Sequence, residues 1–297
     1  METARTGYAP ALPMPVAGVM VLLCAVWGLN MVAMKIGAEG ISPALQGAIR
    51  SVGATLLGLV WCRARGVKLA PMLGPTLWPG VLVGVVFGLE FAAVFMGAAI
   101  NSASRAVLFL YAAPFFVALG AHLFVPGDRI SGRAFLGLVV AFAGLAVGLL
   151  DGLGGGSLLG DVLCLLGALG WAATTVLIKA TSLRAAPAEY AMMYQLAISV
   201  PVLLALSVLM AEPGIFAPTP IIWASMAYQT VVVAFMSYIA WFWLVKRHAA
   251  SRLSAFSFLT PLFGTLCGWA LLGEELGPIF LLALALVCVG ILLVNSK

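Results

Sequence analysis

Two charged side chains, a carboxylate and a guanidinium, lie deep inside long apolar stretches. Such groups can carry protons, bind charged groups of a substrate or form an ion pair. Glu90 lies about 14 residues into one stretch and Arg50 about nine residues into another, so helices would place them about 21 Å and 13 Å from the ends of their stretches. A charge in hydrocarbon costs at least about 2.5 kcal/mol, so both should face a partner or an aqueous cavity. Glu90 is interpreted as a proton carrier, as a contact for a substrate amino group, or as the partner of Arg50 in a structural ion pair.

Polar and aromatic residues within other apolar stretches form a second candidate set. Asn30, Tyr111 and Tyr238 are candidates for a cavity wall, because polar groups that face lipid lose hydrogen bonds. For Asn30 and Tyr111, a hydrogen bond between helices is an equal alternative. Trp171 would suit stacking on a flat apolar molecule, with ordinary packing as its alternative. Together with Glu90, these four residues are the predicted binding site.

Several groups that membrane enzymes and pumps need are missing from the sequence. It contains no HExxH, no GxSxG and no GxxxxGK followed by Ser or Thr. Its five cysteines lack the close spacing of a metal site and are interpreted as packing residues. We therefore expect no catalytic residues, no metal and no cofactor.

The amino-acid composition indicates that the segments containing these residues are embedded in a lipid bilayer. Of the 297 residues, 64% are hydrophobic and only 8% are charged, against about 25% charged in soluble domains. The net charge of +5 comes from basic residues in short gaps between apolar runs, which argues against a nucleic-acid partner. The expected partners are the lipid bilayer and a small-molecule substrate, and the oligomeric state is not predicted.

The apolar runs predict an all-α integral membrane protein with ten transmembrane helices. Pro114 and Pro261 lie inside the fourth and ninth runs, where each interrupts helical hydrogen bonding and is a candidate hinge. The ten predicted spans are 15–36, 41–63, 76–98, 103–124, 133–150, 158–179, 187–210, 220–245, 252–272 and 277–294.

The two halves of the sequence resemble each other. Each half contains five predicted spans, an odd number, so the second half should enter the membrane from the opposite side. The sequence thus predicts two inverted five-helix repeats around a central cavity, 1–150 and 151–297. The matched elements are Trp27-Gly28-Leu29-Asn30 to Lys35 with Trp171-Ala172-Ala173-Thr174 to Lys179, Pro43 with Pro187, Ala103-Ser104-Arg105 and Pro114 with Ala250-Ser251-Arg252 and Pro261, and Gly127-Asp128 and Gly144 with Gly273-Glu274 and Gly290.

The basic residues of the loops and helix ends predict the orientation. If both termini are cytoplasmic, all of these lysines and arginines except Lys35 and Arg105 fall on the inner side. The opposite orientation would reverse the usual excess of positive charge in cytoplasmic loops. Both termini are therefore predicted to be cytoplasmic.

From about residue 15 to 294 these repeated elements resemble the drug/metabolite transporter superfamily, in particular its ten-span EamA-type members. Within it, the chain is most similar to bacterial aromatic amino acid exporters. The resemblance implies a basket-like bundle in the bacterial inner membrane, with a cavity lined by the first, third and fourth spans of each half. The second half departs from the first-half pattern, with Ala172 in place of Gly28 and Thr174 in place of Asn30.

The resulting functional prediction is a transporter rather than an enzyme. It would export small metabolites, most directly aromatic or hydrophobic amino acids, by alternating access. Doubly anionic phosphates usually need clusters of Arg or Lys, which the spans lack. The alternatives are a membrane enzyme acting on lipid-linked substrates, and a carrier or channel for other metabolites or hydrophobic cations. Proton coupling through Glu90, the direction of net transport and the exact substrate stay open.

Overall fold

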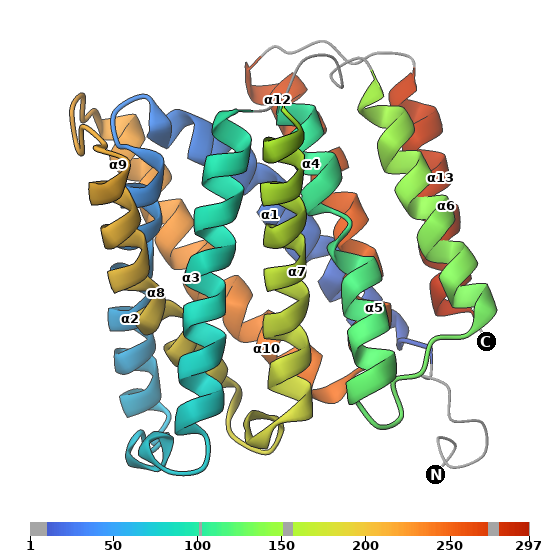
Figure 1. The fold of residues 1–297 in the computed structure, drawn as a ribbon, viewed down its shortest axis with the longest axis horizontal. Coiled ribbons are helices and arrows are strands. Elements are labelled where there is room, and N and C mark those ends of the chain that lie inside the picture. The colour runs from blue at the N-terminus through green and yellow to red at the C-terminus, as the bar shows by residue number, and fades with distance from the viewer. Residues whose placement is uncertain (1–10, 101–102, 151–156, 273–278, 297) are drawn as a thin grey trace.

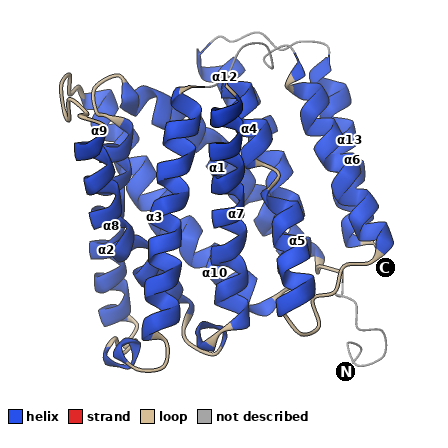
Figure 2. Cartoon of the chain, viewed as in Figure 1, coloured by secondary structure: helices blue, strands red, loops and turns tan. Residues whose placement is uncertain are grey.

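A computed structural model describes residues 11–100, 103–150, 157–272 and 279–296. In this part of the chain the regular structure is helical, apart from one isolated bridge between Ile41 and Ile215. The helices stand side by side in one bundle (Figure 2). The first helix begins and the last helix ends at the same end of that bundle (Figure 1).

The helices follow the apolar runs closely. The first half contains α1 (Met14–Ala38), α2 (Pro43–Ala64), the short η2 (Ala70–Leu73), α3 (Leu77–Ala99), α4 (Ala103–Leu110), α5 (Ala113–Phe124) and α6 (Gly132–Gly148). The second half contains α7 (Leu158–Ala180), η4 (Ser182–Arg184), α8 (Ala188–Leu209), α9 (Pro220–Ala227), η5 (Tyr228–Ser237), α10 (Tyr238–Arg247), α11 (Ala250–Ala255), η6 (Phe256–Phe258), α12 (Leu259–Leu272) and α13 (Ile279–Asn295).

Eight helical segments of the described chain are long and apolar enough to cross a membrane. The fifth and tenth predicted spans correspond to α6 and α13, which have 17 residues each, at the lower limit for crossing hydrocarbon. Many large apolar side chains on the outside of the bundle, such as Leu56, Leu166 and Leu292, are exposed. The all-helical membrane fold is confirmed, whereas the count of ten spans stays a prediction.

The fourth and ninth predicted spans are interrupted just before their prolines. α4 ends at Leu110, and α5 begins at Ala113 with Pro114 in its first turn. In the second half, η6 separates α11 from α12, whose third residue is Pro261. Proline has no N–H to donate and restricts the residue before it, so a break on its N-terminal side is the expected geometry. A hinge role for Pro114 and Pro261 stays a prediction.

The eighth predicted span holds an unexpected segment. Between α9 and α10 the chain forms a π-helix, η5, of 10 residues. Long π-helical segments are rare, and shorter ones often lie at functional sites. In this segment the Ser237 hydroxyl donates to the Val233 carbonyl oxygen and accepts a 2.9 Å hydrogen bond from Trp27 Nε1 of α1. The π-helix is thereby joined to the first helix of the chain.

Helices of the two halves pack mainly on each other. α3 lies against α7 and α8, α2 against α8, α1 against α12, and α6 against α13. The α6–α13 pair stands at one edge of the bundle (Figure 1). A Cβ atom added at Gly290 would lie 2.5 Å from both the Ala141 amide nitrogen and the Gly137 carbonyl oxygen. The two backbones touch there because neither glycine has a side chain.

This close approach predicts that Gly290→Ala will lower the melting temperature of the protein in detergent. Alanine favours a helix over glycine by about 1 kcal/mol, but forcing a methyl group into packed backbone costs about 1–3 kcal/mol. The matched control is Gly18→Ala on α1, where the added Cβ meets nothing within 4 Å. We expect the control to be neutral or stabilising. Equal melting temperatures for the two variants would contradict the backbone contact.

Candidate functional site

A cavity of about 520 Å³ lies within the bundle. It is lined by residues of α1, α2, α3, α4, α7, α8, α10, α12 and the π-helix, so both halves of the chain contribute. Its volume falls in the range of about 300–1,000 Å³ that is usual for small-molecule sites. The residues of α3 that line it run from Phe87 to Ala98, from the middle of that helix to the end opposite the chain termini (Figure 1).

Aromatic side chains form a large part of the cavity wall. Tyr111 and Trp171 meet edge to face with ring centroids 5.7 Å apart, which joins α7 to the break between α4 and α5. Trp27 and Trp241 meet in the same way at 5.6 Å. Edge-to-face pairs hold rings in fixed orientations and add to the stability gained by burial. The aromatic lining residues are Trp27, Phe87, Phe91, Phe95, Tyr111, Trp171, Tyr238, Trp241 and Phe242.

Two opposite charges line the same cavity. Arg50 of α2 is only 3% exposed, and its guanidinium carbon lies 4.9 Å from the centroid of the Phe91 ring. Glu90 of α3 immediately precedes that phenylalanine in the chain. In the described residues no hydrogen bond or ion pair joins Arg50 to Glu90, and Arg50 Nε, Arg50 Nη2 and Glu90 Oε2 are buried without partners. A coupled pair of Arg50 and Glu90 stays a prediction.

Uncharged polar atoms of the cavity share this lack of partners. Asn30 Oδ1 on α1 and Gln195 Oε1 on α8 are buried without a hydrogen bond in the described chain. Native proteins leave few buried polar atoms unpaired, so a cluster of them in one cavity calls for an explanation such as a bound molecule. These unpartnered atoms make the cavity the candidate binding site.

Glycines of α7 bring that helix close to Glu90. A Cβ added at Gly170 would lie 2.9 Å from the Glu90 Cβ, and one at Gly167 would lie 3.5 Å from the Glu90 carbonyl oxygen. Small residues allow helices to approach closely within a membrane. The sequence of α7 therefore fixes the position of the Glu90 backbone against the wall that Trp171 helps to form.

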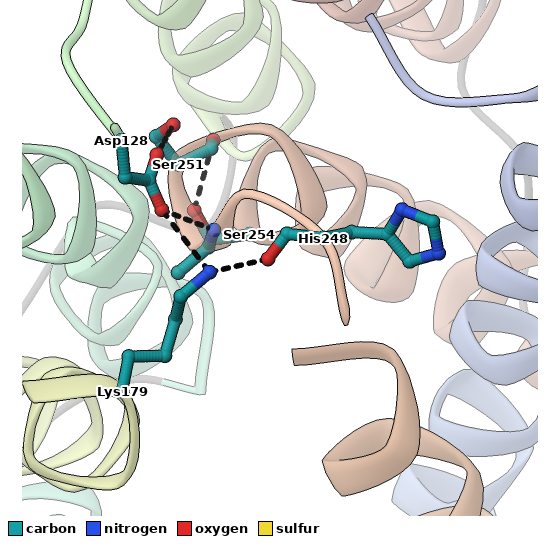
Figure 3. A network of polar contacts seen from close by, with 6 residues as sticks. Asp128, Lys179, His248, Ser251 and Ser254 are labelled. Atoms are coloured by element: carbon teal, nitrogen blue, oxygen red, sulfur yellow. Dashed lines mark hydrogen bonds and ion pairs between the residues drawn. The ribbon is translucent and has the colours of Figure 1, made fainter. Parts of the chain in front are cut away.

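Asp128 and Lys179 are the centre of a polar network outside the cavity lining (Figure 3). Lys179 Nζ, at the end of α7, is 3.4 Å from Asp128 Oδ2 in the loop after α5 and also donates to the His248 carbonyl oxygen. Asp128 accepts a 2.6 Å hydrogen bond from the Ala250 amide and another from the Ser251 hydroxyl. Asp128 is 2% exposed and Lys179 8%.

This network joins the two halves at the end of the bundle where the chain termini lie. Its members come from the loop after α5, from α7, and from the junction of α10 and α11. The His248 ring points away from the Asp128–Lys179 pair and only its carbonyl group takes part (Figure 3). Burial and the charges of Lys179 and Arg247 lower the pKa of His248, so the ring is mainly uncharged at neutral pH.

All five residues predicted to bind a substrate line the cavity: Asn30, Glu90, Tyr111, Trp171 and Tyr238. Their contact with a ligand stays a prediction. Pro114 and Pro261 do not line it in the described chain. The predicted binding site did not include Gln195, or the aromatic face that Phe87, Phe91 and Phe95 present on α3. The four-residue spacing of these phenylalanines, which puts them on one side of a helix, was an available signal.

The Asp128–Lys179 pair was also not predicted from the sequence, where Lys179 counted only among the basic residues of the inner side. The signal available was indirect. Asp128 and Ser251 both belong to elements that recur in the two halves, and Lys179 ends the second copy of the tryptophan-to-lysine element.

Comparisons with known proteins agree with this architecture. The model of the EamA-like transporter family matches residues 15–150 and 158–296. A "Probable amino-acid metabolite efflux pump" of Escherichia coli (strain K12) is 28% identical over 290 residues, covering 92% of this chain and 93% of that protein. The protein of the same name in Salmonella typhimurium (strain LT2) is 27% identical over 284 residues, covering 91% of each chain.

Two further similarities concern localisation and fold. The "Uncharacterized inner membrane transporter YedA" of Escherichia coli (strain K12) is 24% identical over 282 residues, covering 95% of this chain and 91% of that protein. A solved crystal structure superposes with a TM-score of 0.80 at 20% identity, covering 95% of this chain and 98% of the other. The likeness to that structure shows the fold alone.

Proposed function

Because the chain belongs to the EamA-like transporter family of multi-pass membrane proteins, we propose that it exports amino acids with aromatic or hydrophobic side chains across the bacterial inner membrane. Relatives named as amino-acid metabolite efflux pumps, and another named as an inner membrane transporter, support the substrate class and the location. The sequence identities are low, so the proposal depends on the cavity itself.

One observation carries the substrate class: the cavity combines nine aromatic lining residues with a buried Arg50 and a half-buried Glu90, and neither charge has a hydrogen-bond partner in the described chain. A zwitterion supplies a complementary charge for each, while the aromatic wall suits an apolar or aromatic side chain. Arg50 is the only Lys or Arg among the described lining residues. A doubly anionic phosphate would usually be held by several such residues.

We propose alternating access between two inverted five-helix repeats, residues 1–150 and 151–297, in a ten-span bundle. The helix contacts support this arrangement because they come in matched pairs. α1 packs on α12, while its counterpart α7 packs on α5. α3 packs on α7, while η5, in the counterpart of α3, packs on α1. The breaks before Pro114 and Pro261 are the proposed hinges.

The position of the polar network supports a cavity closed toward the cytoplasm. Both chain ends are proposed to be cytoplasmic, and the Asp128–Lys179 network lies at their end of the bundle. The lining of the cavity extends along α3 toward the opposite end. In the alternate state this network would open, and the halves would meet on the outer side.

Exchange in liposomes tests the function. Purified protein in vesicles loaded with unlabelled phenylalanine should take up labelled phenylalanine from outside, saturably and much faster than vesicles without internal amino acid. Exchange needs a site that reorients while loaded, so this result is specific to a carrier. Non-saturable flux would indicate a channel, chemical conversion of the label an enzyme, and no exchange of any amino acid would refute the proposed function.

A further inference from the structure

The side-on edge of the Arg50 guanidinium is buried at the cavity lining. Its two unpartnered nitrogens are Nε and Nη2, both buried and without a hydrogen bond in the described chain. These two N–H groups point in parallel and match the two oxygens of one carboxylate. We propose that Arg50 binds the α-carboxylate of the substrate through this edge, while Glu90, Asn30 and Gln195 receive its ammonium group. This inference rests on the proposed amino-acid transport and assigns the residues that would select for it.

The orientation of Arg50 is set before any substrate binds. Its guanidinium carbon lies 4.9 Å from the centre of the Phe91 ring, a cation–π contact that restrains the guanidinium group. The side chain is 3% exposed, and no carboxylate of the described residues forms an ion pair with it. Buried N–H donors without acceptors are unfavourable, so an occupant that brings a carboxylate supplies the acceptors that these two nitrogens lack. The surroundings of Arg50 thus favour an anionic group on the ligand.

Three unpartnered acceptors in the same cavity fit an ammonium group. Glu90 Oε2 comes from α3, Asn30 Oδ1 from α1 and Gln195 Oε1 from α8. An ammonium group has three N–H donors, one for each of these oxygens. Glu90 directly precedes Phe91, the ring that Arg50 of α2 contacts, and the charges of Glu90 and Arg50 act on each other. Such neighbouring charges suit an amino acid, whose ammonium and carboxylate groups share one carbon.

The remaining cavity wall is aromatic and would receive the side chain of the substrate. Tyr111, Trp171 and Trp27 present aromatic surface and are held by ring contacts to one another or to Trp241. A flat or branched apolar side chain gains contact there without needing hydrogen bonds. The site should therefore require both charged groups at one end of the ligand while tolerating different apolar side chains.

This division predicts a selectivity that can be measured on the unmodified protein. Phenethylamine retains the ammonium group and the ring but leaves Arg50 without an anion. 3-Phenylpropionate retains the carboxylate and the ring but leaves the three acceptors without donors. In liposomes that exchange labelled phenylalanine, we expect unlabelled phenylalanine to compete at least tenfold more strongly than either analogue. Competition by phenethylamine as strong as that by phenylalanine would overturn the assignment of Arg50.

Arg50→Lys tests the residue itself, because lysine keeps the positive charge but lacks the two parallel N–H donors of the guanidinium. We expect phenylalanine exchange to fall at least tenfold, and the preference for phenylalanine over phenethylamine to shrink. A merely structural role would lower the amount of folded protein without changing that preference. The matched control is Arg247→Lys, whose exposed side chain lies over Trp243 outside the described cavity lining; it should exchange like the unmodified protein.

The outcomes separate this inference from the proposed function. If the unmodified protein exchanges no amino acid, the proposed function fails and the inference fails with it. If it exchanges phenylalanine but does not discriminate against the two analogues, or if folded Arg50→Lys keeps full exchange and selectivity, only the inference fails. If Arg50→Lys does not fold, the competition measured on the unmodified protein decides.

Discussion

Replacing Asp128 with asparagine is expected to lower the free energy of unfolding by about 3–5 kcal/mol, the range found when one partner of a buried ion pair is removed. Lys179 Nζ, 3.4 Å from Asp128 Oδ2 and in a side chain that is only 8% exposed, would keep its charge and lose its only described carboxylate partner. Asparagine could still accept a hydrogen bond from the Ala250 amide or the Ser251 hydroxyl. The expected loss is therefore mainly the cost of the unpaired ammonium group.

The measurement is denaturant or thermal unfolding in detergent, with two controls. Glu39→Gln removes an exposed carboxylate beyond the end of α1 and should change stability by less than about 0.5 kcal/mol. Adding Lys179→Met to Asp128→Asn should recover much of the loss, because an apolar replacement leaves no buried charge. An Asp128→Asn protein as stable as the Glu39→Gln control would rule out the buried pair as a support of this end of the bundle.

Glu90→Gln is expected to slow phenylalanine exchange by about thirtyfold or more. Removing one member of a buried, hydrogen-bonded charge pair costs at least about 2 kcal/mol, and each 1.36 kcal/mol is a factor of ten. In the proposed site the pair is the Glu90 carboxylate and the substrate ammonium, and an amide cannot supply the negative charge. The expected loss concerns binding, and the folded fraction should stay near that of the unmodified protein.

The same variant addresses proton coupling. A carboxylate that binds either a proton or an ammonium group exchanges one for the other, so acid on the substrate side should slow exchange by the unmodified protein. Glutamine does not titrate, so the residual exchange by Glu90→Gln should be independent of pH. Glu39→Gln should keep the original pH profile. A pH profile of Glu90→Gln that parallels the unmodified one would assign the proton dependence to another group.

The helix positions were largely predictable because lipid imposes long apolar runs with polar or proline-containing ends. The predicted span 41–63 corresponds to α2 (Pro43–Ala64), and 158–179 corresponds to α7 (Leu158–Ala180). The interruptions near Pro114 and Pro261 followed from proline chemistry alone. The π-helix at Tyr228–Ser237 was not predictable, because its sequence is an ordinary apolar run and its Ser237 is bonded to Trp27 from a distant part of the chain.

Five residues of the candidate site were predictable, and the rest of its lining was not. An intramembrane carboxylate such as Glu90 stands out because its burial is costly wherever it faces. Gln195 and Trp241 could not be assigned to the site, because lipid-facing and cavity-facing surfaces are both apolar and the sequence does not show which side of a helix faces inward. The Asp128–Lys179 pair needed the contact between the loop after α5 and the end of α7, which depends on the packing of the two halves.

The α6–α13 pair, where the backbones meet at Gly137 and Gly290, contributes no residue to the described cavity lining. Helix packing at the edge of the bundle and substrate selectivity in the cavity therefore depend on different helices of one chain. Substitutions that change the cavity lining need not disturb the packing of α6 on α13. Substitutions in the α6–α13 pair, in turn, need not alter substrate recognition. Such a division would let relatives diverge in what they transport while they keep one scaffold.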